Sequence, residues 1–61
     1  MIKTVIKTGM GNVMVFDENG EQMPEYQGKH EDMKECILRN APPEALFFDE
    51  LIIPPILREE W

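Results

Sequence analysis

The chain contains one histidine, His30, and one cysteine, Cys36, two residue types that often supply a general base and a nucleophile. Both fall in a segment with helical periodicity, where six residues of separation place two side chains about 240° apart around the helix axis. A nucleophile and its base must lie within hydrogen-bond reach, so this spacing argues against a catalytic pair. We expect Cys36 to be a small core residue and His30 to be solvated. The sequence therefore predicts no catalytic residue and no enzyme activity.

Two short motifs suggest a bound ligand, but neither has the spacing that its ligand needs. Asp17-Glu18-Asn19-Gly20-Glu21 is rich in carboxylates. An EF-hand calcium loop, however, has glycine at its sixth position and glutamate at its twelfth, which is Gly28 here. Gly9-Met10-Gly11 lacks the lysine and the following helix of a phosphate-binding loop, which favours a hinge or an open turn. One histidine and one cysteine cannot supply four zinc ligands within one chain. We predict no metal site and no cofactor.

The charge of the chain is negative and unevenly placed. The net charge is −6. Residues 1–16 carry Lys3 and Lys7 without any acid, a charge of +2, whereas the remainder carries twelve acids and four basic residues, a charge of −8. An acidic surface repels phosphate backbones, so we expect no direct binding to nucleic acid. It favours a protein partner with a basic surface, although solubility alone also explains a charge of this size.

A length of 61 residues allows one small domain. Such a chain buries only about 60% of its unfolded surface, and a lone cysteine cannot form an internal disulfide. We therefore expect a homo-oligomer, most simply a two-fold dimer. We also expect a complete cytoplasmic product with no membrane association. A single cysteine suits a reducing compartment, and lysines interrupt the apolar start of the chain, unlike a secretory signal. No stretch approaches the ~20 apolar residues that a membrane span needs.

The first half of the chain has the composition of β-strands. Residues 2–8 are β-branched residues interrupted by lysines, which suits an edge strand. Residues 13–16 are apolar on both faces, which suits a central strand. Between them and a short returning strand, Asn19-Gly20 predicts a type I′ hairpin turn with positive φ at both positions. Pro24 limits the returning strand to a short or edge position.

The second half predicts one helix and one further strand. From Lys29 to Asn40 the apolar residues recur at helical spacing, with acids in the first turn and Arg39 in the last. Pro42-Pro43 stops the helix, and residues 45–48 read as a strand. We predict a small single-domain α+β fold with an antiparallel sheet of three to four strands, one amphipathic helix and the order β-β-β-α-β. The compact domain spans residues 1–50.

Residues 51–61 are predicted to form an extended apolar tail, because Pro54-Pro55 excludes both a helix and a central strand. A thin domain has little surface left to bury the apolar residues of this tail, and unburied apolar segments mark interfaces. An aromatic residue at the chain end also fits a binding hot spot. The alternative is a strap that completes the core of the monomer. The predicted interface residues are Leu51, Ile52, Ile53, Ile56, Leu57 and Trp61.

The short length, acidic balance, hairpin, single helix and lack of a catalytic motif together resemble the small phage-encoded proteins that block bacterial defence, anti-CRISPR proteins among them. The resemblance implies an inhibitor or regulator that acts by protein contact in the host cytoplasm. It carries no individual residue, because no specific motif is shared. Two other functions remain open on the sequence: a structural or assembly subunit of a larger complex or virion, and an oligomeric protein that binds a small ligand between subunits.

Overall fold

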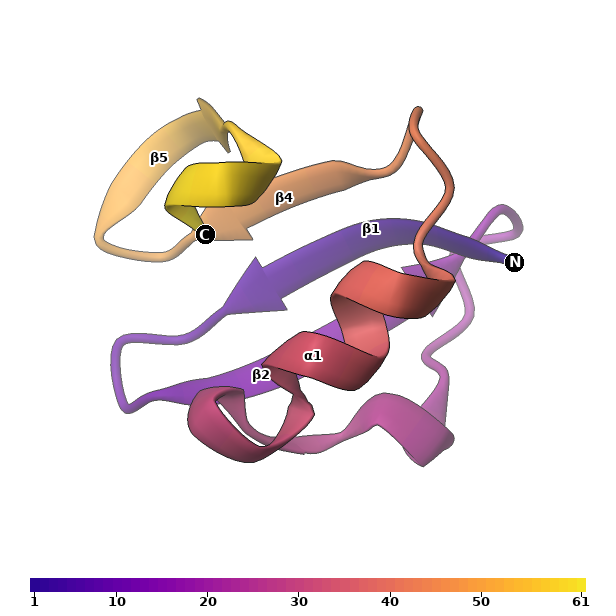
Figure 1. Cartoon of the computed structure of the whole chain (residues 1–61), viewed down its shortest axis with the longest axis horizontal. Helices are drawn as coiled ribbons and strands as arrows, with labels where there is room; N and C mark the ends of the chain where they lie inside the picture. The colour runs from indigo at the N-terminus through magenta and orange to yellow at the C-terminus, as the bar shows by residue number, and fades with distance from the viewer.

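The computed structural model describes the backbone of all 61 residues and every side chain except that of Ile53. The chain folds into two layers, a twisted sheet and a layer that holds one α-helix and a short C-terminal 3-10 turn (Figure 1). The elements in chain order are β1 (Ile2–Lys7), β2 (Asn12–Asp17), the 3-10 turn η1 (Pro24–Tyr26), β3 (Gly28–Lys29), α1 (His30–Asn40), β4 (Leu46–Asp49), β5 (Ile52–Ile56) and the 3-10 turn η2 (Arg58–Glu60).

The predicted α+β class with one helix is confirmed, but the sheet differs from the prediction in size and in strand direction. It has five strands in the order β3-β2-β1-β4-β5. β1 is antiparallel to β2 and parallel to β4. The parallel pair arises because α1 carries the chain back across the sheet before β4 begins, and a crossover of this kind is what joins parallel strands. The fifth strand comes from the predicted tail.

β1 lies at the centre of the sheet, so its predicted edge position is wrong. Simple alternation places Val5 on the same face as two lysines, which led to that prediction. In the structure Val5 does share the helix-facing side with Lys7, and the core buries both Ile2 and Val5, three residues apart. A register shift in the β1–β2 pairing between Ile2 and Thr4 makes this possible, because a bulge resets the alternation of faces. β2 is a central strand as predicted, with β1 and β3 on its two sides.

The turn after β2 lies where Asn19 and Gly20 predicted it, but it is not type I′. Gly20 alone has positive φ, +82°, and Asn19 does not. The Gly20 N–H donates to the Asp17 carbonyl at 3.0 Å, and the Asp17 N–H donates to the Glu21 carbonyl at 2.9 Å. This pattern fits a three-residue hairpin loop, in which a turn is followed by one left-handed glycine. The Asp17 carboxylate fixes the loop by accepting the N–H groups of Asn19 and Glu21.

This turn supports a direct test. Gly20→Val forces a β-branched side chain into positive φ, and we expect it to lower the free energy of unfolding by about 1–3 kcal/mol. Gly20→Asn is the matched control, because asparagine tolerates this region and should cost much less. Asn19→Ala should be nearly neutral, whereas a type I′ turn would make it costly. Thermal unfolding of the three variants distinguishes the two turn types.

The helix is confirmed to within one residue of its predicted start. α1 has Glu31 and Asp32 in its first turn and Arg39 in its last, each favourable to the helix dipole. Of its residues, only Ile37 is fully buried. Among the side chains that the structure describes, it joins a buried cluster of nine residues: Ile2, Val5, Val13, Val15, Ile37, Ala41, Ala45, Phe47 and Trp61.

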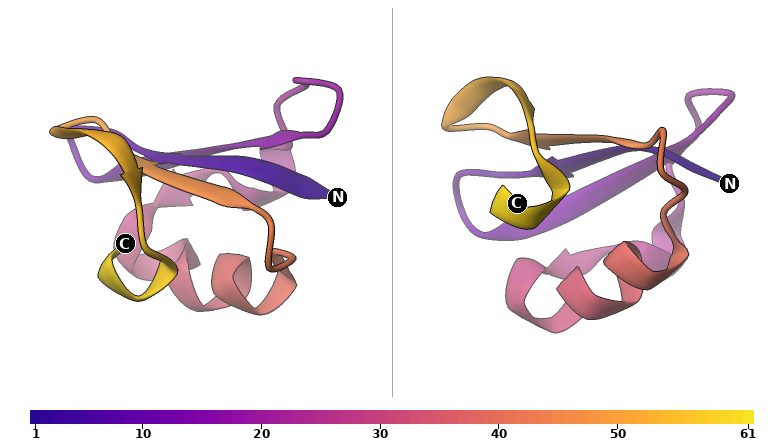
Figure 2. Two further views of the ribbon diagram at one scale, coloured as in Figure 1. Left: turned by 90° about the horizontal axis from the view of Figure 1, so that it is seen from above. Right: turned by 45° about the horizontal axis from the view of Figure 1, so that its top comes forward.

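The predicted division into a domain of residues 1–50 and a tail of residues 51–61 does not match the packing. The segment is extended, as Pro54-Pro55 requires, but it forms β5 and pairs with β4 through Asp49 and Ile52 and through Phe47 and Ile56. From the outer edge of the sheet it turns toward the helix side, where η2 lies beside α1 (Figure 2). An edge position tolerates proline, because the missing N–H groups need not face a neighbouring strand. The segment therefore belongs to the single folded unit.

Candidate functional site

Among the described residues, one face of the sheet has no covering layer. Both α1 and η2 lie on the same side of the sheet, and the opposite side is open (Figure 2). Strand register places two cross-strand rows of side chains on this open side, because successive residues alternate between the faces. We call this set the bare face: Phe16, Thr4 and Leu46 in one row, and Met14, Ile6 and Phe48 in the other.

None of the six positions of the bare face carries a charged residue. Five of its residues are hydrophobic, and the sixth is threonine. Leu46 is exposed, and the other five are half-buried. This composition stands out in a chain in which 30% of the residues are charged. A contiguous apolar surface of this kind marks an interaction site more often than a solvated surface.

An acidic turn borders the bare face at one end. The loop of residues 17–21 rises from the sheet on the side away from α1 (Figure 2). It carries Asp17, Glu18 and Glu21, and the last two are exposed. Glu18 also lies 3.5 Å from the N-terminal amine of Met1. The surface therefore combines an apolar centre with an acidic border.

The predicted interface residues fall into separate environments. Leu51, Ile52 and Leu57 are exposed by 78%, 52% and 59%. Ile56 is half-buried and packs against the core, and the side chain of Ile53 lies outside the described residues. Trp61, in contrast, is only 3% exposed. The placement predicted for Trp61 is therefore wrong, and the alternative of a strap that completes the core describes this residue.

Trp61 is held by three contacts from different parts of the fold. Its indole N–H donates to the Phe48 carbonyl at 3.2 Å. Its ring packs at 5.1 Å from the ring of Phe47 and edge-on at 4.5 Å to the ring of His30. Nε2 of His30 lies 2.8 Å from the Trp61 backbone oxygen, so His30 is a structural contact and not the solvated residue that we expected.

Arg58 fastens the same segment to the end of the helix. Its guanidinium donates to the carbonyls of Leu38 at 3.2 Å and Pro42 at 2.6 Å. It also lies over the ring of Phe47, 5.1 Å from the ring centre. Beside it, an open apolar groove of about 480 Å³ runs between the 41–47 segment and the chain from Ile56 to Glu59. Leu46 lines this groove and also belongs to the bare face.

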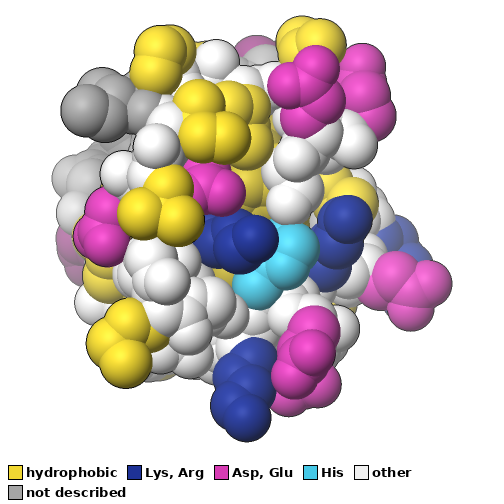
Figure 3. Space-filling view, turned by 90° about the vertical axis from the view of Figure 1, so that its left-hand side faces the viewer, with side chains coloured by type: hydrophobic (Ala, Val, Ile, Leu, Met, Phe, Trp, Pro, Cys, Tyr) yellow, Lys and Arg dark blue, Asp and Glu magenta, His cyan; other side chains and the backbone are white. Residues whose placement is uncertain are grey.

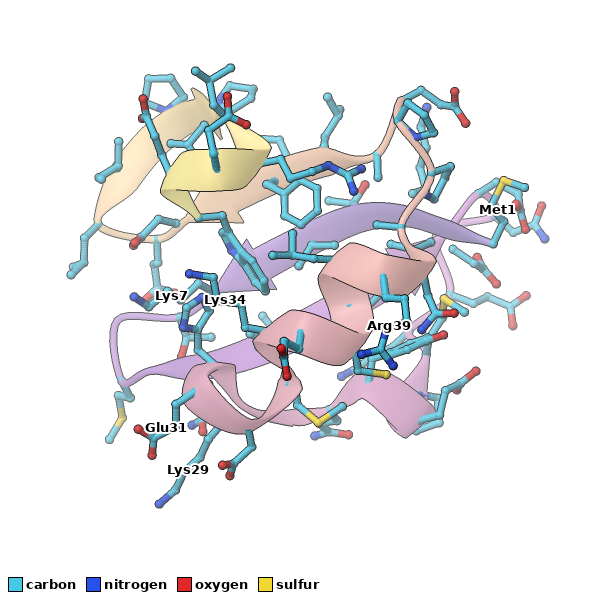
Figure 4. The ribbon with its side chains drawn as sticks, in the orientation of Figure 1. Met1, Lys7, Lys29, Glu31, Lys34 and Arg39 are labelled. Carbon is cyan, nitrogen blue, oxygen red and sulfur yellow. The ribbon has the colours of Figure 1, made fainter. Side chains whose placement is uncertain are left out.

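A second surface gathers positive charge around the start of α1. We call it the basic corner: Lys7 from β1, Lys29, and His30 and Lys34 from α1. In Figure 3 the single histidine has basic side chains on both sides, and Figure 4 shows Lys7 and Lys34 reaching the same region from two elements. Desolvation lowers the pKa of His30, the hydrogen bond to Trp61 opposes this shift, and Lys7 and Lys34 lower the pKa further. Asp49 opposes them weakly.

Of the two residues considered for catalysis, His30 contacts the Trp61 backbone oxygen and Cys36 lies beside Asn40. Cys36 is half-buried, and its sulfur lies 3.6 Å from the Asn40 amide nitrogen. In the part of the chain that the structure describes, no three histidine, cysteine, aspartate or glutamate side chains are placed to hold a metal ion. Within the same residues, no helix has the length and apolar character needed to cross a membrane.

Sequence reasoning missed both surfaces. The apolar residues on both faces of residues 13–16 indicated a buried strand, although a single predicted helix can cover only one face of a sheet. That mismatch was the available signal for the bare face. The signal for the basic corner was weaker: the first 16 residues contain lysines but no acid. Sequence alone could not connect Lys7 with His30, which lies 23 positions later in the chain.

Comparison of the chain with protein-family models, with curated proteins and with solved structures finds no match in any of the three.

Proposed function

We propose that this protein is a non-catalytic binding protein that acts by protein contact through its bare face. The observation that supports the proposal is the uncharged surface of Thr4, Ile6, Met14, Phe16, Leu46 and Phe48, which no other element covers in the part of the chain that the structure describes. An apolar centre with a polar rim is the usual anatomy of a protein interface. A specific interface takes about 800 Å² from each partner, roughly a fifth of the 4156 Å² surface of this chain.

The partner that fits this surface is a different protein with an apolar patch bordered by lysine or arginine. The acidic loop of residues 17–21 stands at the edge of the bare face, so a basic border on the partner gains attraction and speeds the encounter. A second copy of the chain would bring another apolar face but also a further charge of −6. The charge balance therefore favours a heterologous complex over the homodimer that the sequence predicts.

An inhibitor or regulator of the anti-defence type is the class that best suits such a surface. A protein of this size blocks a target by occupying one of its functional surfaces, which needs a rigid apolar patch and no chemistry of its own. The expected cytoplasmic location belongs to the same proposal. An assembly subunit would use the bare face to join its own particle, and the identity of the captured partner distinguishes these two roles.

The test begins with a photo-crosslinking amino acid at Thr4, which traps whatever covers the bare face in cells that naturally contain the protein. The trapped partner is then purified, and its affinity for variants is measured by calorimetry. Ile6→Lys places a charge between Met14 and Phe48, and we expect the affinity to fall at least about thirtyfold, equivalent to about 2 kcal/mol.

Leu57→Lys is the matched control, because it adds the same charge at an exposed apolar position outside the bare face. It should leave the affinity within about threefold. If Leu57→Lys abolishes binding while a folded Ile6→Lys does not, the binding surface is the C-terminal one that the sequence predicted. Sedimentation covers the remaining case: a stable mass of twice 7.1 kDa that Ile6→Lys reduces to the monomer would assign the bare face to a second copy.

A further inference from the structure

The basic corner concentrates positive charge in an acidic protein. Three of the six basic residues of the chain belong to it: Lys7 and Lys34 act on the charge of His30, and Lys29 directly precedes that histidine. Figure 4 shows the side chains of Lys7 and Lys34 in one region, whereas that of Lys29 extends away from them. Lys29 is exposed, and the other two lysines are half-buried. Lys7 stands on the helix-facing side of β1, in the row that contains the buried residue Val13, where a charged side chain is uncommon.

These lysines are not neutralised by ion pairs within the described residues. The one ion pair found there, between the Met1 amine and Glu18, lies elsewhere on the chain. Asp49 is the register partner of Lys7 across β1 and β4, yet its carboxylate accepts the Leu51 N–H at 2.9 Å. Glu31 lies at the rim of the corner on the first turn of α1, and the main-chain oxygen of Trp61 lies 2.8 Å from Nε2 of His30, where it offsets part of the positive charge. Convergence of like charges is unfavourable unless an anion compensates it.

The corner is also concave. Lys7, Lys29, His30 and Glu31 line a pocket of about 360 Å³ together with Met10 and Gly11 of the β1–β2 turn. The His30 N–H donates to the Gly11 carbonyl at 2.8 Å, which fixes the turn against the start of the helix. The N-terminal end of α1 adds its positive dipole potential to that of the lysines.

From this geometry we propose that the basic corner is a binding site for a compact, doubly charged oxyanion, the phosphate monoester group of a small ligand. Lys7 and Lys29 line the pocket, and Lys34 adds its charge from the next turn of α1, so a ligand group with two negative charges fits better than a carboxylate with one. The pocket volume lies in the range of small-ligand sites. A nucleic acid does not fit, because its extended backbone would also meet the acidic remainder of the chain. The site is separate from the bare face, since Lys7 points to the opposite side of the sheet from Ile6.

The test uses sulfate as the probe, because its charge of two does not change near neutral pH. The only histidine supplies the readout, since the NMR signals of its ring report its pKa without ambiguity. Sulfate bound in the pocket offsets the field of Lys7 and Lys34, so we expect the pKa of His30 to rise saturably with sulfate. Sodium chloride at equal ionic strength should produce a smaller and unsaturable change. Methyl phosphate should act like sulfate, and dimethyl phosphate, with one charge, should bind more weakly.

Charge variants locate the site. Lys7→Met keeps the aliphatic stem and removes the charge, and we expect it to weaken sulfate binding about tenfold. Lys29→Met makes the same change at an exposed position, which keeps the test valid if Lys7→Met fails to fold. Glu31→Gln removes the competing acid and should tighten binding. Lys3→Met, at the opposite end of β1, should have no effect. Equal responses to sulfate and chloride, or equal losses in Lys3→Met and Lys29→Met, would overturn the proposal.

Discussion

Trp61→Ala is expected to lower the free energy of unfolding by about 3–5 kcal/mol, the usual cost of removing a large aromatic side chain from a core. Trp61 belongs to the buried core cluster, and its indole contacts Phe47, His30 and the Phe48 carbonyl. A domain of this size has little stability to spare, since small proteins are commonly stable by only about 5–15 kcal/mol. We therefore expect the urea midpoint of the variant to fall by roughly half or more.

Two variants show where the stability of this segment comes from. Leu57→Ala removes an exposed leucine four residues earlier and should change the stability by no more than about 0.5 kcal/mol. Trp61→Phe keeps an aromatic ring but loses the hydrogen bond to Phe48, so it should lie between the other two variants. If Trp61→Ala instead left the stability unchanged but weakened binding to the partner, Trp61 would be an interface residue, as the sequence predicted.

Ile37→Ala is expected to cost about 3 kcal/mol, because Ile37 is the only fully buried side chain of α1 and the substitution leaves a cavity between helix and sheet. It belongs to the same buried cluster as Val5, Val15 and Phe47, which come from three different strands. A cavity at this position loosens the helix from the whole sheet. The free energy of unfolding from urea denaturation measures the effect, with an unchanged slope showing that the unfolded state is not altered.

Cys36→Ala is the matched control for Ile37→Ala. Cys36 is the preceding residue on the same helix and is half-buried, so we expect its replacement to cost less than about 1 kcal/mol. The bare face and the basic corner should be little affected by Cys36→Ala, which makes it a suitable reference for binding experiments. A loss in Cys36→Ala equal to that in Ile37→Ala would mean that the helix packs through a different stripe of residues.

Local features of this chain were predictable because their causes lie within a few residues. Acids in the first turn and Arg39 in the last, followed by Pro42-Pro43, set both ends of the helix. Gly20 located the hairpin turn for a similar reason, since a turn needs positive φ where glycine stands. The type of that turn was mispredicted, because the Asp17 carboxylate organises the loop so that Asn19 keeps a negative φ.

Only the tertiary structure decided the features that depend on distant pairings. The parallel pairing of β1 with β4 put the first strand at the centre of the sheet, although its lysines had suggested an edge. The pairing of β5 with β4 brought Trp61 back to His30, 31 residues earlier, and changed an expected interface residue into a core residue. The pairing of β1 with both β2 and β4 assembled the bare face. The pairing of β2 with β3, Asn12 with Lys29, brought the start of α1 to the β1–β2 turn and so formed the basic corner. Sequence periodicity reports which residues share a face of one element, but it carries no information on which elements become neighbours or on which face stays uncovered.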